Sequence, residues 1–377
     1  MTPRVADCTP LRCRDYHAAI GMDVLMVTDR WDETGGGRER YMAELRTSLV
    51  RRGCSVGVLA GRARRLRRGV EHFRRSHPSS RVLSARPAAG ATHYQLHSGV
   101  YAAAYAAEGD SYDSTLRRLF FLPALRLNVR RRRLLQLEAR MLDARSDTRV
   151  MAFSARSRDD LQRLFGISAD RVVLARPGVD LTLFRPPSAA EAAADRSSRR
   201  DRIRLLFAGH NFALKGLRWA LEATALARRR GIDAEMVVAG RGPTRAFAAL
   251  ARRLKIDAHV RFAGAVAQPV LAELYRQSDL LVHPAFYDPF PRVIVEAMAC
   301  GVPVVTTAAC GGAELITAGR NGVVVTDPRE IDAIAGAIAS VTASDRRAAM
   351  SVEAAETGRG FDFEAHVDAV AAWLACA

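Results

Sequence analysis

The sequence predicts an α/β protein with two doubly wound domains that face each other across a cleft. Apolar strand-like runs alternate with helical patterns in both halves of the chain, which is typical of parallel sheets covered by helices. The 377 residues exceed what one ordinary core accommodates, and a polar, Ala- and Ser-rich segment at 186–202 is expected to link the two domains. Ligands of such sheets bind outside the carboxyl ends of the strands, so the cleft is the expected site.

The first domain is expected over residues 22–185. It opens with the strand MDVLMVTD, a Gly-rich loop and a helix in which Tyr41, Leu45 and Leu49 share one face, and this βαβ start favours a parallel sheet. The run GRARRLRRG at 61–69 is interpreted as a basic patch. The later strands and one further helix of this domain are expected within residues 54–61, 92–101, 147–166 and 170–187.

The second domain is expected over residues 203–355. Strand and helix patterns alternate through it as in the first domain. Residues 356–377 contain an amphipathic pattern, and we expect a C-terminal helix there that packs back on the first domain. The strands of the second domain are expected within 203–209, 233–240, 259–266, 279–285, 302–307 and 321–325, and its helices within 217–231, 241–256, 269–278 and 292–301.

The net charge of +17 indicates a partner that is anionic, although an Arg-rich composition alone could also produce it. Nucleic acid, an anionic membrane surface and phosphorylated substrates are the three classes considered. Residues 114–142 interleave arginines with leucines and phenylalanines, which favours an anionic membrane surface, and a packed helix with a solvated Arg face is the alternative. Nucleic acid is not expected, because the chain has no recognition-helix motif and no interleaved stacking aromatics.

The ends of the chain and its cysteines bear on localisation. Residues 1–21 have no apolar central run and are interpreted as a disordered extension rather than a signal peptide, with Met22 as an alternative start of translation. The six cysteines fit no metal motif or disulfide framework, which favours a reducing compartment. We therefore expect a cytoplasmic protein, peripheral at the inner face of the cell membrane. The cysteines are at positions 8, 13, 54, 300, 310 and 376.

The stretch DPFPRVIVEAMACG places two carboxylates, Asp288 and Glu296, around the start of a predicted helix. The preceding strand ends near Pro284, so Asp288 is expected on the loop at the sheet edge and Glu296 about two turns into the helix. The free N–H groups near Val293 and Ile294 favour an anion, above all a phosphate. This order of groups suits a sugar, a diphosphate and a ribose, whereas the alternative is a capped helix with a solvated Glu.

Other predicted strand ends of the second domain carry compatible loops. Lys215 follows Gly209 by six residues and precedes a helix, so it can reach a phosphate in the same cleft. Gly240 lies in the tight turn AGRGP, and CGGAELI at 310–316 is another Gly-rich turn. Each signal is weak alone, but together they predict a phosphate or nucleotide site.

As a set, these motifs resemble the retaining family 4 glycosyltransferases, which have the GT-B fold of two Rossmann-like domains. The similarity covers nearly all of 203–326 and includes TGGGRERYMAELRTSLVRRGCSVGVL in the first domain. Within the family, HPAFYDPFPRVIVEAMACGVPVVTT is most similar to lipopolysaccharide core glucosyltransferases.

The resemblance implies roles for individual residues. Lys215, Asp288 and His97 would be catalytic, with Lys215 on the donor pyrophosphate and the other two near the sugar. Glu296 would hold the ribose, and Gly36 and Gly37 would let the first loop close over the diphosphate. The implied donor-binding set is Gly36, Gly37, Gly209, Lys215, Gly240, Asp288, Phe290, Arg292, Val293, Ile294 and Glu296.

Three positions depart from the family pattern. Asp288 replaces the usual Glu and is one methylene shorter, and Pro291 replaces a Gly and removes an N–H donor. His210 replaces an Arg, so a phosphate cation would be supplied elsewhere, for which Arg176 and Arg292 are candidates.

The implied activity is transfer of a hexose from a nucleotide sugar, UDP-glucose being one candidate, to an envelope glycan or lipid-linked acceptor with retention of configuration. Stabilising the departing diphosphate by Lys215 and amide dipoles would be the main catalytic effect. No cofactor or metal is expected, because no Asp-x-Asp motif follows a predicted strand. Two alternatives are a sugar-nucleotide epimerase of the same fold and a non-catalytic protein that binds a nucleotide sugar.

Overall fold

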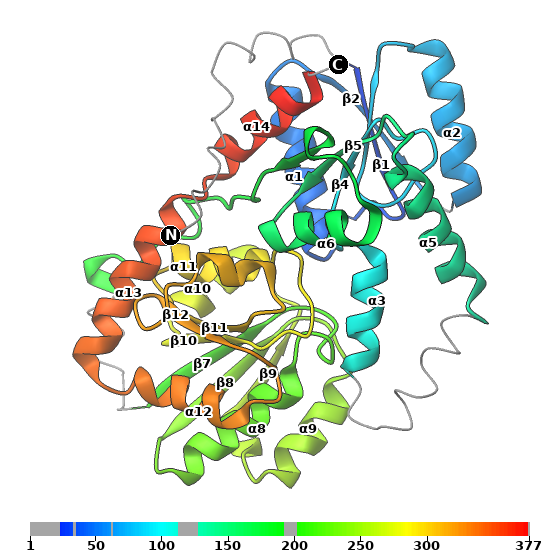
Figure 1. Ribbon diagram of the computed structural model, residues 1–377. Coiled ribbons are helices and arrows are strands. Elements are labelled where there is room, and N and C mark those ends of the chain that lie inside the picture. The colour runs from blue at the N-terminus through cyan, green and yellow to red at the C-terminus, as the bar shows by residue number, and fades with distance from the viewer. Residues whose placement is uncertain (1–22, 33–34, 62, 112–126, 192–201, 376–377) are drawn as a thin grey trace, which may run out of the picture.

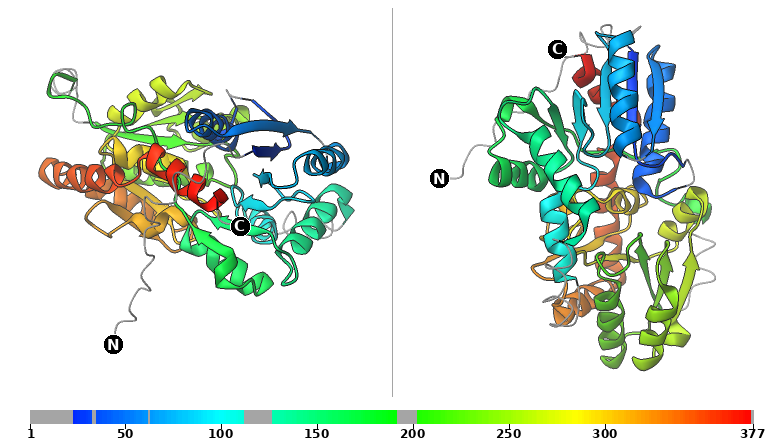
Figure 2. Two further views of the ribbon diagram at one scale, coloured as in Figure 1. Left: turned by 90° about the horizontal axis from the view of Figure 1, so that it is seen from above. Right: turned by 90° about the vertical axis from the view of Figure 1, so that its right-hand side faces the viewer.

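The computed structural model describes residues 23–32, 35–61, 63–111, 127–191 and 202–375. Two lobes are stacked end to end, and each contains a six-stranded parallel sheet flanked by helices (Figures 1 and 2). This architecture confirms the predicted pair of doubly wound domains. The expected extension at 1–21 and residues 192–201 of the expected linker lie outside the described residues.

The first lobe has the strand order β2-β1-β3-β4-β5-β6, and each pair of neighbours is parallel. Val24, Met26 and Val27 of β1, an interior strand of this sheet, are fully buried, as expected for a strand covered on both faces. Its strands are β1 (Asp23–Thr28), β2 (Ser55–Ala60), β3 (Arg81–Ser84), β4 (His93–Gln95), β5 (Arg149–Ala152) and β6 (Val172–Leu174). Its helices include α1 (Gly37–Arg51), α2 (Ala63–Ser76), α3 (Tyr101–Asp110), α5 (Val129–Leu142) and α6 (Ala155–Phe165).

The second lobe has the order β12-β11-β10-β7-β8-β9, again with parallel neighbours. The strands β7 and β10 are adjacent at its centre although about 70 residues separate them in the chain. Its strands are β7 (Ile203–Ala208), β8 (Ala234–Ala239), β9 (Val260–Gly264), β10 (Leu280–His283), β11 (Val304–Thr307) and β12 (Gly322–Val325). Its helices are α8 (Leu217–Arg229), α9 (Thr244–Arg253), α10 (Gln268–Arg276), α11 (Arg292–Ala299), α12 (Ile331–Ser340) and α13 (Ser344–Arg359).

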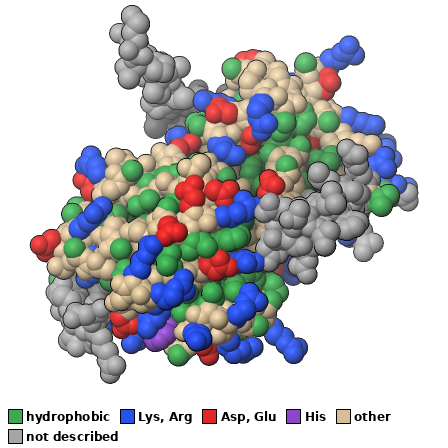
Figure 3. Space-filling model, turned by 60° about the horizontal axis from the view of Figure 1, so that its bottom comes forward, with side chains coloured by type: hydrophobic (Ala, Val, Ile, Leu, Met, Phe, Trp, Pro, Cys, Tyr) green, Lys and Arg blue, Asp and Glu red, His purple; other side chains and the backbone are tan. Residues whose placement is uncertain are grey.

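The interpretation of 61–69 as a basic patch was incomplete, because most of this run belongs to helix α2. Leu66 and Val70 of α2 are buried, and Phe73 is half-buried one turn further on. Their spacing is that of one helix face. The many arginines between them stay on the opposite, exposed face, and their number hid the apolar pattern. Lys and Arg side chains are also spread over the face of the molecule in Figure 3, where they alternate with acidic ones.

The chain returns to the first lobe through α14 (Phe363–Ala375). The expected boundary at 355/356 falls inside α13, which packs on α11 of the second lobe. After α13 the chain crosses between the lobes, where the N–H of Val179 donates to the carbonyl of Phe361. Helix α14 then lies beside α1 and buries Val367, Val370 and Trp373 (Figure 1). The first lobe therefore contains a helix from the far end of the sequence.

Candidate functional site

A cavity of about 630 Å³ lies between the lobes and is lined by residues of both. The first lobe contributes the start of α1 and the loop after β4. The second lobe contributes the loops that follow β7, β8, β9 and β10, together with α11. These are the carboxyl ends of parallel strands, where ligands of such sheets bind.

Lys215 and Asp288 both line this cavity and form an ion pair. Their loops follow the adjacent strands β7 and β10, and Lys215 Nζ lies 2.6 Å from Asp288 Oδ2. Gly216 allows this approach, because it has φ +78° and a Cβ there would collide with the carbonyl of Pro284. The structure therefore brings together two residues that are 73 positions apart in sequence.

A histidine that the sequence reasoning missed completes this pair. His283, the last residue of β10, lies with Nε2 3.1 Å from the same Oδ2 of Asp288. Burial would raise the pKa of Asp288, but Lys215 and His283 together lower it below its usual value, so the carboxylate is ionised. Burial lowers the pKa of His283 despite its contact with Asp288, so the ring is neutral at neutral pH and donates through Nε2.

Glu296 lies on α11, as expected, and its residue is only 1% exposed. Its Oε2 accepts a hydrogen bond of 3.0 Å from the hydroxyl of Tyr275, another residue that was not predicted. Val293 lines the cavity. The expectation of a free N–H at Ile294 was wrong, because this N–H donates to the carbonyl of Pro291, and the side chain of Ile294 is buried in the core.

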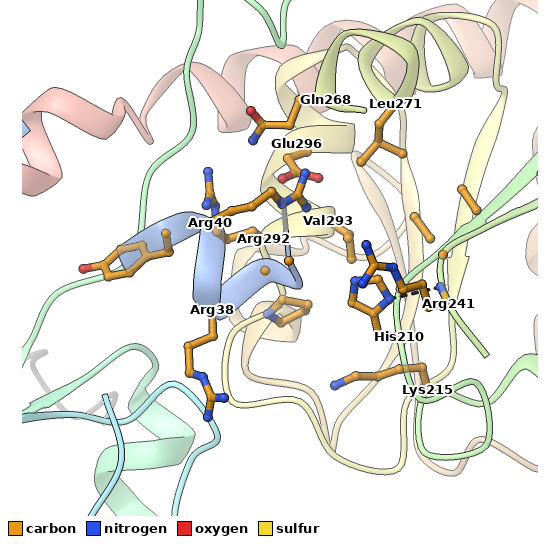
Figure 4. A pocket seen from close by; sticks show the side chains of 18 of the residues that line it. Arg38, Arg40, His210, Lys215, Arg241, Gln268, Leu271, Arg292, Val293 and Glu296 are labelled. Atoms are coloured by element: carbon orange, nitrogen blue, oxygen red, sulfur yellow. Dashed lines mark hydrogen bonds between the residues drawn. The ribbon is translucent and has the colours of Figure 1, made fainter. Parts of the chain in front are cut away.

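The N-terminus of α1 faces His210 across the cavity. A Cβ on Gly36 would lie 3.2 Å from His210 Cδ2, so the lobes approach closely here. His210 Nδ1 accepts a hydrogen bond of 3.0 Å from the N–H of Arg241, which leaves the proton of the neutral ring on Nε2 (Figure 4). Burial and the nearby Arg40 and Arg241 lower the pKa of His210, so this neutral form prevails at neutral pH.

Three cavity cations, Arg38, Arg40 and Arg241, were missed by the sequence reasoning. The signal was available, because the first two come directly after the Gly-rich loop and the third lies within AGRGP. Figure 4 shows Arg40 and Arg292 near Glu296, with Lys215 pointing into the cavity from the opposite side. The structure thus collects several cations around one cavity, as an anionic ligand requires.

The two proposed substitutes for an arginine at 210 have different positions. Arg292 lines the cavity, and its Nη1 lies 2.9 Å from Glu44 Oε2 of α1. Arg176 is not among the residues that line the cavity and instead pairs with Glu314. Of the two, only Arg292 is placed to meet a ligand in this cavity.

His97 is on the loop after β4 and is half-buried at the wall of the cavity. Its ring packs edge-on against Tyr41 at 4.7 Å and Phe153 at 4.9 Å. Burial, followed by the positive charge of Arg38, lowers the pKa of His97 well below its usual value. The imidazole is therefore neutral, which suits hydrogen bonding to a sugar better than charge neutralisation.

Most of the remaining residues predicted for the donor site also line the cavity. Gly37, Gly209, Gly240 and Phe290 also line the cavity, whereas Gly36 is not among its lining residues. The expected membrane segment 114–142 is only partly covered, since residues 112–126 lie outside the described part of the chain. Within α5, Arg130, Arg132 and Arg133 are exposed. No described helix combines the length and hydropathy needed to cross a membrane.

Two six-stranded Rossmann-like lobes that enclose a cation-rich cavity define the GT-B class of fold. The fold matches a solved structure of WaaG, a glycosyltransferase involved in lipopolysaccharide biosynthesis, with a TM-score of 0.78 and 21% identity over 94% of this chain and 100% of that one. It also matches Anabaena Alr3699/HepE in complex with UDP-glucose, with a TM-score of 0.69 and 19% identity over 93% and 98%.

Residues 189–357 match the family model described as Glycosyl transferases group 1. A D-inositol 3-phosphate glycosyltransferase of Paenarthrobacter aurescens (strain TC1) is 33% identical over 193 residues, which are 50% of this chain and 47% of that protein. Another, from Catenulispora acidiphila, is 35% identical over 58% of this chain and 55% of that protein. The chain spans about half the length of these curated relatives.

Proposed function

We propose that the protein is a retaining hexosyltransferase that moves a hexose from a nucleotide sugar to an envelope glycan or a lipid-linked acceptor. One observation carries this proposal. Lys215, the stretch with Asp288 and Glu296, and His97 are three separate segments of two lobes, and all four residues line a single cavity. The group 1 match and the GT-B fold agree with this activity.

The donor is expected to lie along the cavity from Glu296 to His97. Oε2 of Glu296 is occupied by Tyr275, so Oε1 is the oxygen available to the ribose hydroxyls. Lys215 and the N-terminus of α1 would hold the diphosphate between the lobes. Asp288 and His97 would then meet the hexose at the far end.

Charge stabilisation is the proposed source of catalysis. As the bond between the sugar and the phosphate breaks, negative charge grows on the departing diphosphate, and preorganised groups aimed at that charge lower the barrier. Lys215 supplies a cation and His210 supplies the Nε2 proton of a neutral ring. These groups would stabilise the diphosphate without a metal.

Retention is proposed to follow from attack of the acceptor on the same face that the diphosphate leaves, with the leaving phosphate taking the proton of the acceptor hydroxyl. Asp288 is not proposed as a covalent nucleophile. Its Oδ2 is shared by Lys215 and His283, and an ionised carboxylate held in this way is a weaker nucleophile than a free one. Asp288 is better placed to accept a hydrogen bond from a sugar hydroxyl.

Lys215→Ala tests the donor site. We expect the affinity for UDP to fall about 10- to 100-fold, because one charge-assisted hydrogen bond is worth about 1.5–3 kcal/mol. Isothermal titration calorimetry measures this, and Arg245→Ala, which removes an exposed cation of α9, is the matched control. Equal UDP affinity for wild type and Lys215→Ala would refute the assignment of Lys215.

The reaction itself is tested by incubating the protein with candidate nucleotide sugars, with UDP-glucose as the first donor because a protein of the same fold binds it. Transfer to an added lipid-linked or glycan acceptor, with the product anomer identified by NMR, would support the proposal. An epimeric nucleotide sugar formed from donor alone would favour the epimerase instead. Donor binding with neither reaction would indicate a binding protein.

We also propose that the protein works at the cytoplasmic face of a membrane, held there by exposed arginines of α5. Replacing the exposed Arg130, Arg132 and Arg133 by Glu should abolish sedimentation with vesicles that contain phosphatidylglycerol, because each basic residue near an anionic surface contributes about 1 kcal/mol. Vesicles of phosphatidylcholine are the control. Unchanged binding of the variant to anionic vesicles would contradict the proposal.

A further inference from the structure

A buried chain of hydrogen bonds connects the C-terminal helix with the cavity. His366 Nε2 of α14 lies 2.8 Å from the hydroxyl of Tyr41 of α1. Nε2 of Gln95, on β4, donates to that hydroxyl at 3.0 Å. The last link joins Gln95 Oε1 to His97 Nε2 at 3.3 Å. Three segments that are remote in sequence thus converge at His97, which lines the cavity together with Tyr41.

The direction of each hydrogen bond in this chain follows from the groups involved. Gln95 Oε1 can only accept, so the proton of neutral His97 is on Nε2. The Tyr41 oxygen accepts from Gln95, so its own proton is free to donate to His366 Nε2. Gln95 cannot easily be reversed, because its Nε2 also faces the sulfur of Met151 at 3.5 Å, which is an acceptor.

This arrangement selects one tautomer of His97. With Nε2 protonated and engaged, Nδ1 keeps a lone pair, and no described residue donates a hydrogen bond to it. His97 lines the cavity, so Nδ1 is the ring atom left for a ligand. The ligand group that matches a neutral nitrogen acceptor is a hydroxyl, of which a hexose carries several.

The chain is enclosed, which gives it the rigidity that such selection needs. Gln95 is fully buried, Tyr41 is 1% exposed and His366 is 5% exposed. A buried polar network whose members are all hydrogen-bonded holds its groups in one arrangement, whereas an exposed one is open to competition from water. Helix α14 also shields the network through Phe363, whose ring packs edge-on to Tyr41 at 6.1 Å.

We propose that His366, Tyr41 and Gln95 are positioning residues that hold His97 in the Nε2–H form, so that its Nδ1 accepts a hydrogen bond from a hydroxyl of the transferred sugar. The C-terminal helix is then a working part of the sugar end of the site, although it touches no ligand itself. This inference rests on the proposed function for the identity of the hydroxyl, but not for the tautomer.

The tautomer is measured on the free protein by NMR. In protein labelled with ¹⁵N-histidine, a long-range ¹H–¹⁵N correlation spectrum separates the two ring nitrogens, and His97→Gln identifies the signals of His97. We expect a pure Nε2–H pattern for His97 at neutral pH. In Tyr41→Phe and in His366→Phe we expect a mixture of tautomers, whereas His366→Gln, whose amide oxygen still accepts from Tyr41, should retain the pure pattern. An Nδ1–H pattern in wild type would overturn the inference.

Kinetics test whether the relay acts through His97. We expect Tyr41→Phe to lower kcat for sugar transfer about tenfold, the effect of one well-placed hydrogen bond, with KM for the donor little changed. In the His97→Ala background the same substitution should lower kcat less than about twofold, because residues that act as a unit are not additive. Tyr94→Phe, which removes another buried hydroxyl of the first lobe, is the control.

The two experiments separate the possible failures. A pure Nε2–H pattern in a protein that uses no nucleotide sugar would refute the proposed function but would still support the selection of the His97 tautomer by this network. An equal loss of kcat from Tyr41→Phe in both backgrounds would overturn the positioning role. If Tyr41→Phe does not fold, the pair His366→Phe and His366→Gln makes the same comparison.

Discussion

His366 is expected to make the protein sensitive to acid. Burial, followed by the positive charge of Arg292, lowers the pKa of His366 from 6.5 to about 3 in the folded protein. The unfolded chain therefore takes up a proton below about pH 6.5 that the folded protein refuses. The contribution of neutral His366 to the free energy of unfolding is therefore complete above about pH 6.5 and is lost as the pH falls toward 3.

The size of the effect follows from the two pKa values. A pH of about 5 lies about 1.5 units below the pKa of the histidine in the unfolded chain. Protonation of the unfolded chain therefore lowers the free energy of unfolding by about 2 kcal/mol. His93 lies at the same interface, 4.6 Å from the ring of Trp373, and burial lowers its pKa to about 4, so it contributes a similar loss. Acid should therefore weaken the docking of α14 on the first lobe in particular.

Urea denaturation at about pH 7.5 and about pH 5 measures this prediction. The free energy of unfolding of His366→Gln should fall less between the two pH values than that of wild type, by about 2 kcal/mol. Gln keeps an acceptor for Tyr41 but takes up no proton. His72→Gln, which replaces an exposed histidine of α2, should behave as wild type. The same pH dependence in wild type and His366→Gln would refute the reasoning.

Two further predictions concern contacts between the lobes. Gly99→Ala should lower the melting temperature more than Gly166→Ala. Both glycines have a positive φ, which alone costs an alanine about 1–2 kcal/mol, but of the two only Gly99 would place a Cβ against another group, the hydroxyl of Tyr287. Equal melting temperatures of the two variants would contradict this packing. Glu44→Gln should open the lobes and raise the radius of gyration in small-angle scattering. Glu44 of α1 accepts a hydrogen bond of 3.0 Å from Gln268 and forms an ion pair of 2.9 Å with Arg292, both in the second lobe, and Gln removes the charge of this pair. An unchanged radius would show that this contact is dispensable.

The fold and part of the site could be predicted because they depend on local patterns. Alternating strand and helix signals define parallel sheets, and the ends of parallel strands share one edge. Lys215, Asp288 and Glu296 could therefore be assigned to one cleft from the loops that hold them. That β7 and β10 are neighbours, which brings Lys215 within 2.6 Å of Asp288, required the sheet order.

Other features depend on contacts that a single sequence does not display. In the sequence, His283 is only the last residue of a predicted buried strand. Its contact with Asp288 depends on the conformation of the loop after β10, which the sequence does not display. Ile294 has a position at a helix start that suggests a free N–H, yet its amide closes the turn to Pro291. Tyr41 and His366 are separated by 325 positions, and their contact follows from the path of α14 alone.

The return of α14 also has a consequence for the order in which the protein can form. Hydrophobic residues of α1 and β4 begin to emerge from the ribosome early, but the surface that covers them is synthesised about 300 residues later. The surface of the first lobe that α14 covers therefore stays exposed until the second lobe has been translated. Maturation of the amino-terminal half therefore ends only with the arrival of the carboxyl-terminal helix.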